Sequence, residues 1–275
     1  MLGAILGDII GSPFERDGGD KVIDFPLFSK YSRFTDDTVM TFAIFDGLLH
    51  SGFDNPSLDK ISNNMTLFCQ KWGRKYPNAG YGGSFYRWIF SDSPIPYNSF
   101  GNGSAMRVSS IGWLFDSIER TREIACISAS ITHNHKEGIK GAESVASAIY
   151  LARNGKTKKE IKEYIEKEFN YNLETPIDKI RPSYSFDVTC QGSVPEAIRC
   201  FLEGKSYEDV VRLAVSLGGD TDTQGAIAGS IAEAYYDIPD TLKEKCEEYL
   251  EDDMKKLLLK FNEVKKERVI KSIKK

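Results

Sequence analysis

The sequence predicts an all-α fold in a single domain. Apolar residues recur at the three- and four-residue spacing of amphipathic helices along most of the chain, and no segment shows sustained apolar/polar alternation. No proline- or serine-rich linker and no shift in composition divides the 275 residues. Hydrophobic residues make up 41% and charged residues 28% of the chain, which is typical of a globular protein rather than a disordered or membrane protein. A domain of this size can enclose an active site.

The N-terminal segment, residues 1–15, is predicted to form a buried helix. It is apolar, contains no Lys or Arg, is interrupted by Asp8 and is too short to cross a bilayer, so we expect a cytoplasmic protein with no membrane partner. Gly3, Gly7 and Gly11 recur at intervals of four residues. Small residues at this spacing let helices approach closely, so we expect this helix to be central.

Three further helices are predicted in the first two thirds of the chain. The first spans 37–49 and ends before Gly52, the second spans 136–153, and the third spans 161–169. The third is strongly amphipathic and lies in a charged stretch, so we expect it at the periphery.

Two segments, 15–35 and 72–105, are rich in Gly, Pro, Ser, Asn and aromatic residues and are predicted to be long loops. Loops of this length in a compact helical domain are usually functional. We expect residues 16–34 and 72–97 within them to contact the part of a substrate that determines specificity.

Turn and capping residues divide the C-terminal part of the chain more clearly. Pro195 suits a first helical position, and Gly204 suits a helix end. Ser206 and Asp209 have the spacing of a capping box, and the glycine pair 218–219 is expected to stop the helix that follows.

The next predicted helix spans 222–236 and contains Gly225 and Gly229. These small residues have the same four-residue spacing as the glycines of the N-terminal helix. We therefore expect both helices to pack closely at the centre of the domain.

Positive charge is concentrated in the tail, residues 255–275, which is predicted to be a basic helix. Nine Lys/Arg and two Glu give this tail a charge of +7 and leave −11 on the remainder, for a net charge of −4. A basic tail can contact nucleic acid or a membrane. A solvated terminal helix is the simpler interpretation, and we assign the tail no function. We expect a monomer.

Two acidic clusters stand at predicted helix starts, Thr35-Asp36-Asp37-Thr38 and Asp220-Thr221-Asp222-Thr223. Helix capping explains one aspartate in each, because carboxylates are favoured at a helix N-terminus. Capping explains adjacent carboxylates less well, since like charges repel unless a cation lies nearby. All the candidate ligands are hard oxygens without His or Cys beside them, which favours Mg²⁺ or Mn²⁺ over zinc. Two ions that share one carboxylate would use all four aspartates.

Three other features have both a functional and a structural interpretation. The segment 101–107 is a glycine-flanked polar turn that can present N–H groups to a phosphate, although a plain loop before a helix is the commoner cause of such a pattern. His133, in Thr132-His133-Asn134-His135, fits a surface turn or a substrate contact. Glu15 is a lone carboxylate after the N-terminal helix, and out of context it would be a solvated residue.

Taken together, these motifs resemble the ADP-ribosylglycohydrolase family, which includes the dinitrogenase-reductase-activating glycohydrolase. In chain order they are Gly7-Asp8-x-x-Gly11-x-x-x-Glu15, Thr35-Asp36-Asp37-Thr38, Gly101-Asn102-Gly103-Ser104-Ala105-Met106-Arg107, Thr132-His133 and Gly218-Gly219-Asp220-Thr221-Asp222-Thr223. The resemblance covers residues 1–240 at family-like spacing. It implies an all-α, orthogonally packed helical domain with a central dinuclear metal site.

The resemblance also implies a role for each motif residue. Thr35, Asp36 and Asp37 would bind one divalent cation, Asp220 and Thr223 would bind the other, and Asp222 would bridge them. Asn102, Gly103 and Ser104 would hold the diphosphate and ribose, and His133 would lie in the ADP-ribose pocket. The catalytic residues would be Glu15, Asp36 and Asp222: the ions would bind ribose hydroxyls and activate a water, and Glu15 would handle the proton.

The function that the resemblance implies is metal-dependent hydrolysis of the glycosidic bond between ADP-ribose and a target, with arginine on a protein as the favoured linkage. Serine-linked, O-acetyl and nucleic-acid-linked ADP-ribose are alternatives, because they place the same half of the substrate in the pocket. Nucleic acid would then be a partner only as an ADP-ribosylated substrate. A non-catalytic ADP-ribose-binding or structural protein is a further alternative, and the retention of Glu15 and of every expected ligand argues against it.

Overall fold

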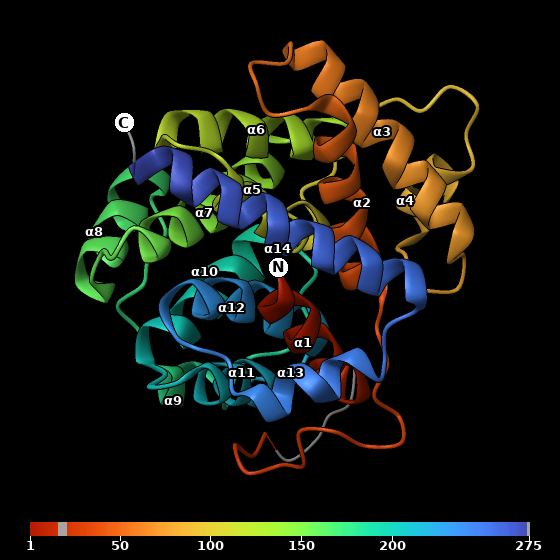
Figure 1. Ribbon diagram of the computed structural model, residues 1–275. Coiled ribbons are helices and arrows are strands. Elements are labelled where there is room, and N and C mark those ends of the chain that lie inside the picture. Colours follow the sequence, from red (N-terminus) through yellow and green to blue (C-terminus); the bar gives the residue numbers. More distant parts are fainter. Residues whose placement is uncertain (16–20, 274–275) are drawn as a thin grey trace.

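The computed structural model describes residues 1–15 and 21–273, with side chains described up to residue 268 (Figure 1). These residues form fourteen α-helices and two short 3-10 helices in one domain, and no β-strand occurs among them. A single isolated antiparallel bridge joins Gly101 to Thr189. The predicted all-α fold is confirmed.

Helices α1 (Leu2–Gly11) and α12 (Thr221–Tyr235) form the central pair. Their backbones touch where both helices carry glycine: a Cβ added to Gly7 would lie 2.0 Å from the carbonyl oxygen of Gly225, and one added to Gly3 would lie 2.4 Å from that of Gly229. No side chain fits between helices at that separation. The prediction from glycine spacing is confirmed, and the contact places the N-terminal end of α12 beside the C-terminal end of α1.

Helix α2 (Asp36–Ser51) begins within the first acidic cluster and packs against α3 (Leu58–Lys75), which in turn packs against the short α4 (Gly83–Ile89). The predicted loop over 72–105 is therefore partly wrong, because it contains the end of α3 and all of α4. Phe85 and Trp88 are buried one helical turn apart, and this short apolar pattern is hidden among glycines and aromatic residues.

The helices that follow α4 up to residue 180 are α5 (Ser109–Leu114), α6 (Ile118–Ser130), α7 (Lys136–Arg153), α8 (Lys158–Phe169) and α9 (Ile177–Ile180). Helices α6, α7 and α8 lie together in the upper left part of Figure 1. The two predicted helices of this region are confirmed. The peripheral α8 begins with a capping box between Thr157 and Glu160 and packs on α7.

Helices α10 (Cys190–Glu203), α11 (Tyr207–Ser216) and α13 (Asp240–Glu247) complete the lower part of the domain in Figure 1. Pro195 lies inside α10 rather than at its start, because Thr189 caps the helix with its side-chain oxygen and forms the first turn earlier. Gly204 ends α10, and Gly218 and Gly219 follow α11 with φ of 73° and 80°, as glycine permits.

The capping box predicted at the start of α11 is only half present. The Ser206 hydroxyl accepts the N–H of Asp209 at 3.1 Å, whereas the Asp209 carboxylate accepts the N–H of Lys205 rather than that of Ser206. The helix start is nevertheless where the sequence predicts it.

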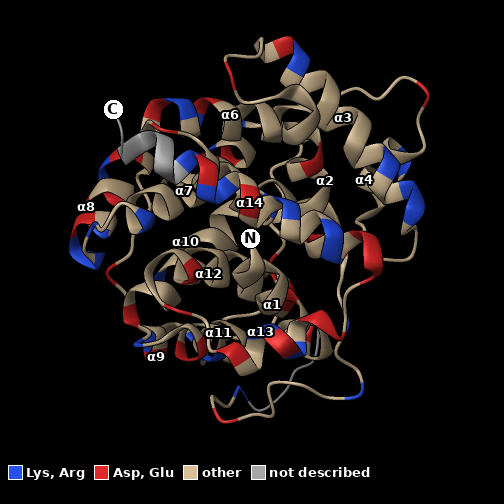
Figure 2. Ribbon diagram, viewed as in Figure 1, with Lys and Arg blue, Asp and Glu red and all other residues tan. Residues whose placement is uncertain are grey.

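Helix α14 (Asp252–Ile273) contains the basic tail and lies across the front of the molecule against α2 and α5 (Figures 1 and 2). The interpretation of the tail as a solvated helix is wrong for its first part, since Met254, Leu258, Phe261 and Val264 are buried. Their three- and four-residue spacing forms an apolar stripe that the surrounding lysines obscure in the sequence. No helix among the described residues is both long and apolar enough to cross a membrane.

Candidate active site

A cleft of about 330 Å³ opens where the N-terminal ends of α2 and α12 meet the loops that follow the 3-10 helix Ser12–Phe14 and α6. It brings together almost every residue that the sequence predicts for the site. The predicted residues that line it are Glu15, Thr35, Asp36, Asp37, Asn102, Gly103, His133, Asp220, Asp222 and Thr223. Segments more than 200 residues apart in the chain therefore form one site.

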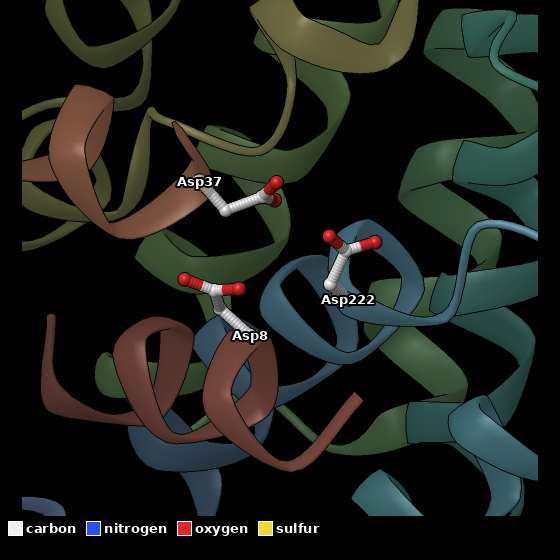
Figure 3. A group of neighbouring side chains, drawn as sticks. All are labelled: Asp8, Asp37 and Asp222. Atoms are coloured by element: carbon white, nitrogen blue, oxygen red, sulfur yellow. The ribbon is translucent and has the colours of Figure 1, made fainter. Parts of the chain in front are cut away.

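Carboxylates from three helices converge where Asp37 and Asp222 line this cleft (Figure 3). Asp8 of α1, Asp37 of α2 and Asp222 of α12 point toward one another, with one oxygen of each lying within 4.8 Å of the others. A second group, Glu15, Asp220 and Asp222, meets the same criterion. Asp222 belongs to both groups, which is the geometry expected of a carboxylate shared between two cations.

The threonines of the acidic clusters connect these carboxylates. Thr35 caps α2, and its hydroxyl donates to an Asp8 oxygen at 2.7 Å. The Thr223 hydroxyl donates to Asp37 Oδ2 at 3.1 Å. Asp36 is only partly buried, lines the cleft beside Gly80, and lies outside both carboxylate groups. The structure thus places Asp37 deeper in the cluster than Asp36.

The 3-10 helix Asn102–Ser104 forms another wall of the cleft. Asn102 donates its side-chain amide to Asp220 Oδ2 at 2.7 Å, and its backbone N–H donates to the carbonyl of Val188 at 2.8 Å. The expectation that this loop presents its N–H groups to an anion therefore does not hold at Asn102. Ser104 does not line the cleft: its hydroxyl is fully buried and donates to the carbonyl of Gly138 at 2.7 Å.

The two histidines of the predicted turn have different environments. His133 follows α6, is 6% exposed and lines the cleft next to Gly101 and Gly103. His135 is the N-cap of α7, where its Nδ1 accepts the N–H of Glu137 at 3.1 Å. His133 therefore lines the cleft, whereas His135 caps a helix.

Comparison with known proteins identifies the family. A family profile described as ADP-ribosylglycohydrolase matches residues 1–268. The chain belongs to the ADP-ribosylglycohydrolase family. The resemblance inferred from the five motifs is therefore confirmed.

This ADP-ribosylglycohydrolase is 29% identical to ADP-ribosylhydrolase ARH3 of Bos taurus, over 92% of this chain and 89% of that protein. It is 24% identical to ADP-ribosylarginine hydrolase Tri1 of Pseudomonas putida (strain GB-1), over 86% of this chain and 70% of that protein. A solved structure described as an ADP-ribosylglycohydrolase-related protein complex has the same fold, with a TM-score of 0.70 at 24% identity, covering 96% of this chain and 97% of that chain. Family membership and the ARH3 relatives identify this chain as a glycosidic hydrolase.

Asp8 is the site residue that the sequence reasoning missed. Its carboxylate accepts both the N–H and the hydroxyl of Thr35 and of Thr38, so it anchors the first turn of α2 to α1. It is fully buried in a helix whose other residues, apart from Leu2, are apolar and buried. A buried carboxylate in an apolar helix needs compensating partners, and that was the available signal in the sequence.

The electrostatics of this ADP-ribosylglycohydrolase site favour a bound cation. Burial and the neighbouring carboxylates raise the pKa of Asp36 to about 8 and also raise the pKa of Asp37 and Asp222. Burial raises the pKa of Asp8 to about 6. Asp37 Oδ1 is buried without a hydrogen-bond partner, and no Lys or Arg in the described part of the chain forms an ion pair with Asp8, Asp37 or Asp222. An all-oxygen donor set with an unsatisfied buried oxygen fits a hard divalent cation.

These pKa shifts predict how the metal-free protein responds to pH. A carboxyl whose pKa is raised in the folded state keeps its proton there and loses it on unfolding, so the free energy of unfolding falls as pH rises from about 4 to 8. Each such group contributes a loss of about 1.4 kcal/mol per pH unit within its own window. Urea unfolding in EDTA at pH 5, 6, 7 and 8 should show this fall, and saturating Mg²⁺ should suppress it. A free energy of unfolding that stays constant or rises with pH in EDTA would contradict the raised pKa values of these carboxyls.

Proposed function

We propose that this hydrolase cleaves the bond between ADP-ribose and an arginine side chain, with two divalent cations bound at the bottom of the cleft. The observation that carries the proposal is the pair of carboxylate groups that share Asp222. All members of that pair except Asp8 line the same cleft as the loop 101–103 and His133, so the acidic centre and a wall for the rest of the substrate face one space.

The cations would be Mg²⁺ or Mn²⁺, because every available donor is a hard oxygen. One cation would be bound by Thr35, Asp36 and Asp37. The other would be bound by Asp220 and Thr223, and Asp222 would bind both. When bound, the pair would supply Lewis acidity and lower the pKa of a water molecule near the glycosidic bond. Asp8 lies close enough to Asp37 and Asp222 to add its charge to the first ion.

The chain's own residues would orient the substrate and move the proton. Glu15 has an oxygen within 4.8 Å of oxygens of Asp220 and Asp222, so it lies at the edge of the acidic centre, where it can exchange a proton with water or the leaving group. Gly103 and His133 would face the diphosphate and ribose. Asn102 would position Asp220 through its amide, and Ser104 would support the loop from behind through Gly138.

Arginine is the linkage that we favour among the candidates. Glu15 lines the cleft outside the proposed ligand set, and its carboxylate would stabilise a guanidinium leaving group. The Pseudomonas putida relative is named for the ADP-ribosylarginine linkage, whereas the name of the ARH3 relatives specifies no linkage. Serine-linked, O-acetyl and nucleic-acid-linked ADP-ribose are the competing substrates.

The test is release of free ADP-ribose from a panel of these four substrates. We expect the arginine adduct to be cleaved fastest, EDTA to abolish turnover, and Mg²⁺ or Mn²⁺ to restore it after EDTA is removed. Faster cleavage of another linkage would overturn the choice of arginine. Full activity in EDTA would overturn the metal proposal, and cleavage of none of the four would overturn the function.

A further inference from the structure

Arg107 is a buried cation at the cleft, and no carboxylate of the described residues forms an ion pair with it. Its side chain is 1% exposed, lines the cleft, and forms no ion pair with any described residue. Its Nη2 donates to the carbonyl of Ser128 and, at 3.0 Å, to Thr132 Oγ1. A guanidinium is always a donor and never an acceptor. The direction of the bond to Thr132 is therefore fixed.

The direction of this bond determines where the Thr132 hydroxyl donates its own hydrogen. Its hydroxyl oxygen accepts from Arg107, and its hydroxyl hydrogen must find an acceptor because the side chain is fully buried. In the described structure, the acceptor within hydrogen-bond distance is His133 Nδ1, at 2.7 Å from Thr132 Oγ1. If Nδ1 carried a hydrogen instead, the hydroxyl hydrogen of Thr132 would be buried without a partner.

The other ring nitrogen of His133, Nε2, faces the loop that contains Gly101 and Gly103. A Cβ added to Gly103 would lie 3.2 Å from His133 Nε2 in a tight contact, and one added to Gly101 would lie 3.5 Å from it in ordinary contact, so the two glycines leave the space in front of Nε2 open. No protein hydrogen bond to Nε2 occurs among the described residues. Burial and the charge of Arg107 lower the pKa of His133, which keeps the ring neutral.

We infer that Thr132, oriented by Arg107, is a positioning residue that holds His133 as the neutral tautomer with its hydrogen on Nε2. His133 then presents a fixed, uncharged N–H donor to an acceptor oxygen of the bound ligand in the space left by Gly101 and Gly103. The identity of that ligand as ADP-ribose rests on the proposed function, whereas the tautomer rests on the hydrogen-bond directions alone.

The tautomer can be observed directly by two-bond ¹H–¹⁵N correlation spectra of the full chain labelled at histidine. The chain has three histidines, His50, His133 and His135, so the signals can be assigned. At neutral pH we expect His133 to show a protonated Nε2 and an unprotonated Nδ1. A protonated Nδ1 would overturn the inference without reference to any ligand.

Three variants separate positioning from general structural damage. Thr132→Val removes the hydroxyl and should mix the two tautomers and weaken the binding of ADP-ribose by about tenfold. Thr132→Ser keeps the hydroxyl, so it should show the parent's single His133 tautomer and the parent's affinity for ADP-ribose. Thr121→Val is the matched control, because Thr121 is a buried threonine of α6 whose hydroxyl donates to the carbonyl of Ser117.

Two outcomes would overturn the positioning role: an unchanged His133 spectrum in Thr132→Val, or a Thr132→Ser variant that behaves like Thr132→Val. Failure of the parent protein to bind ADP-ribose would contradict the proposed function instead. The spectrum of the unliganded parent still decides the tautomer in that case.

Discussion

Asp222→Asn is expected to lower the rate of ADP-ribose release by at least about 10³-fold while the protein remains folded. Asp222 is the residue common to both carboxylate groups, so its loss removes a ligand from each proposed cation at once. A factor of 10³ corresponds to about 4 kcal/mol of transition-state stabilisation. That size is reasonable for a change that disrupts two cations, each of which can supply several kcal/mol.

The same substitution is expected to stabilise the metal-free protein. Asp222 is buried among Asp37, Asp220 and Asp8, and their charges together with burial raise its pKa. Asn removes the charge and keeps the shape, so urea unfolding in EDTA at pH 8 should shift to higher denaturant concentration. Opposite effects on activity and stability identify a residue that is retained for binding a cation rather than for folding.

The control is Asp237→Asn, which changes an exposed aspartate just beyond the end of α12. It should leave both the rate and the unfolding curve unchanged. Normal turnover in Asp222→Asn would refute the two-cation proposal. A loss of both activity and stability would instead assign Asp222 a structural role.

The sequence predicts the site better than it predicts the elements around it. Paired carboxylates at two helix starts carry a strong signal because adjacent like charges are unfavourable without a cation. The glycine spacing in α1 and α12 is equally informative, since a close backbone contact excludes every larger residue. Both signals depend on physical requirements that few other arrangements would meet.

The features that sequence reasoning missed depend on a competing local cap in one case and on tertiary partners in the others. Pro195 is a favourable first residue of a helix, but the cap at Thr189 starts α10 earlier. The lysines of α14 suggest a solvated helix, whereas the apolar stripe that includes Phe261 packs on α2 and α5. The sequence marks Asp8 as a carboxylate in an apolar helix, but its partners Thr35 and Thr38 are identified only by the fold.

Gly7→Ala is expected to destabilise the protein by about 3 kcal/mol or more, at the upper end of what overpacking usually costs. The new Cβ would lie 2.0 Å from the carbonyl oxygen of Gly225, and both partners at this contact are backbone. No side chain can rotate away, so α1 must move from α12. Intrinsic helix propensity opposes this effect by about 1 kcal/mol, since alanine favours the helical state over glycine.

Thermal unfolding of the Gly7→Ala variant should show a midpoint lower by about 6–12 °C for a domain of this size. Gly82→Ala is the matched control, because Gly82 has φ of −60° and a Cβ there would meet no atom within 4 Å. Its midpoint should change little. Equal midpoints for Gly7→Ala and the control would show that the two helices have room to separate without cost.

The same movement should also impair the site, because α1 carries Asp8 and α12 carries Asp222. Gly225→Ala acts at the same contact from the other helix, with its Cβ 2.4 Å from the carbonyl oxygen of Gly7. The two substitutions should therefore be non-additive: once one methyl group has separated the helices, the second costs less. Additive losses would mean that each alanine acts within its own helix, and the close approach of α1 to α12 would then not be what aligns the carboxylates.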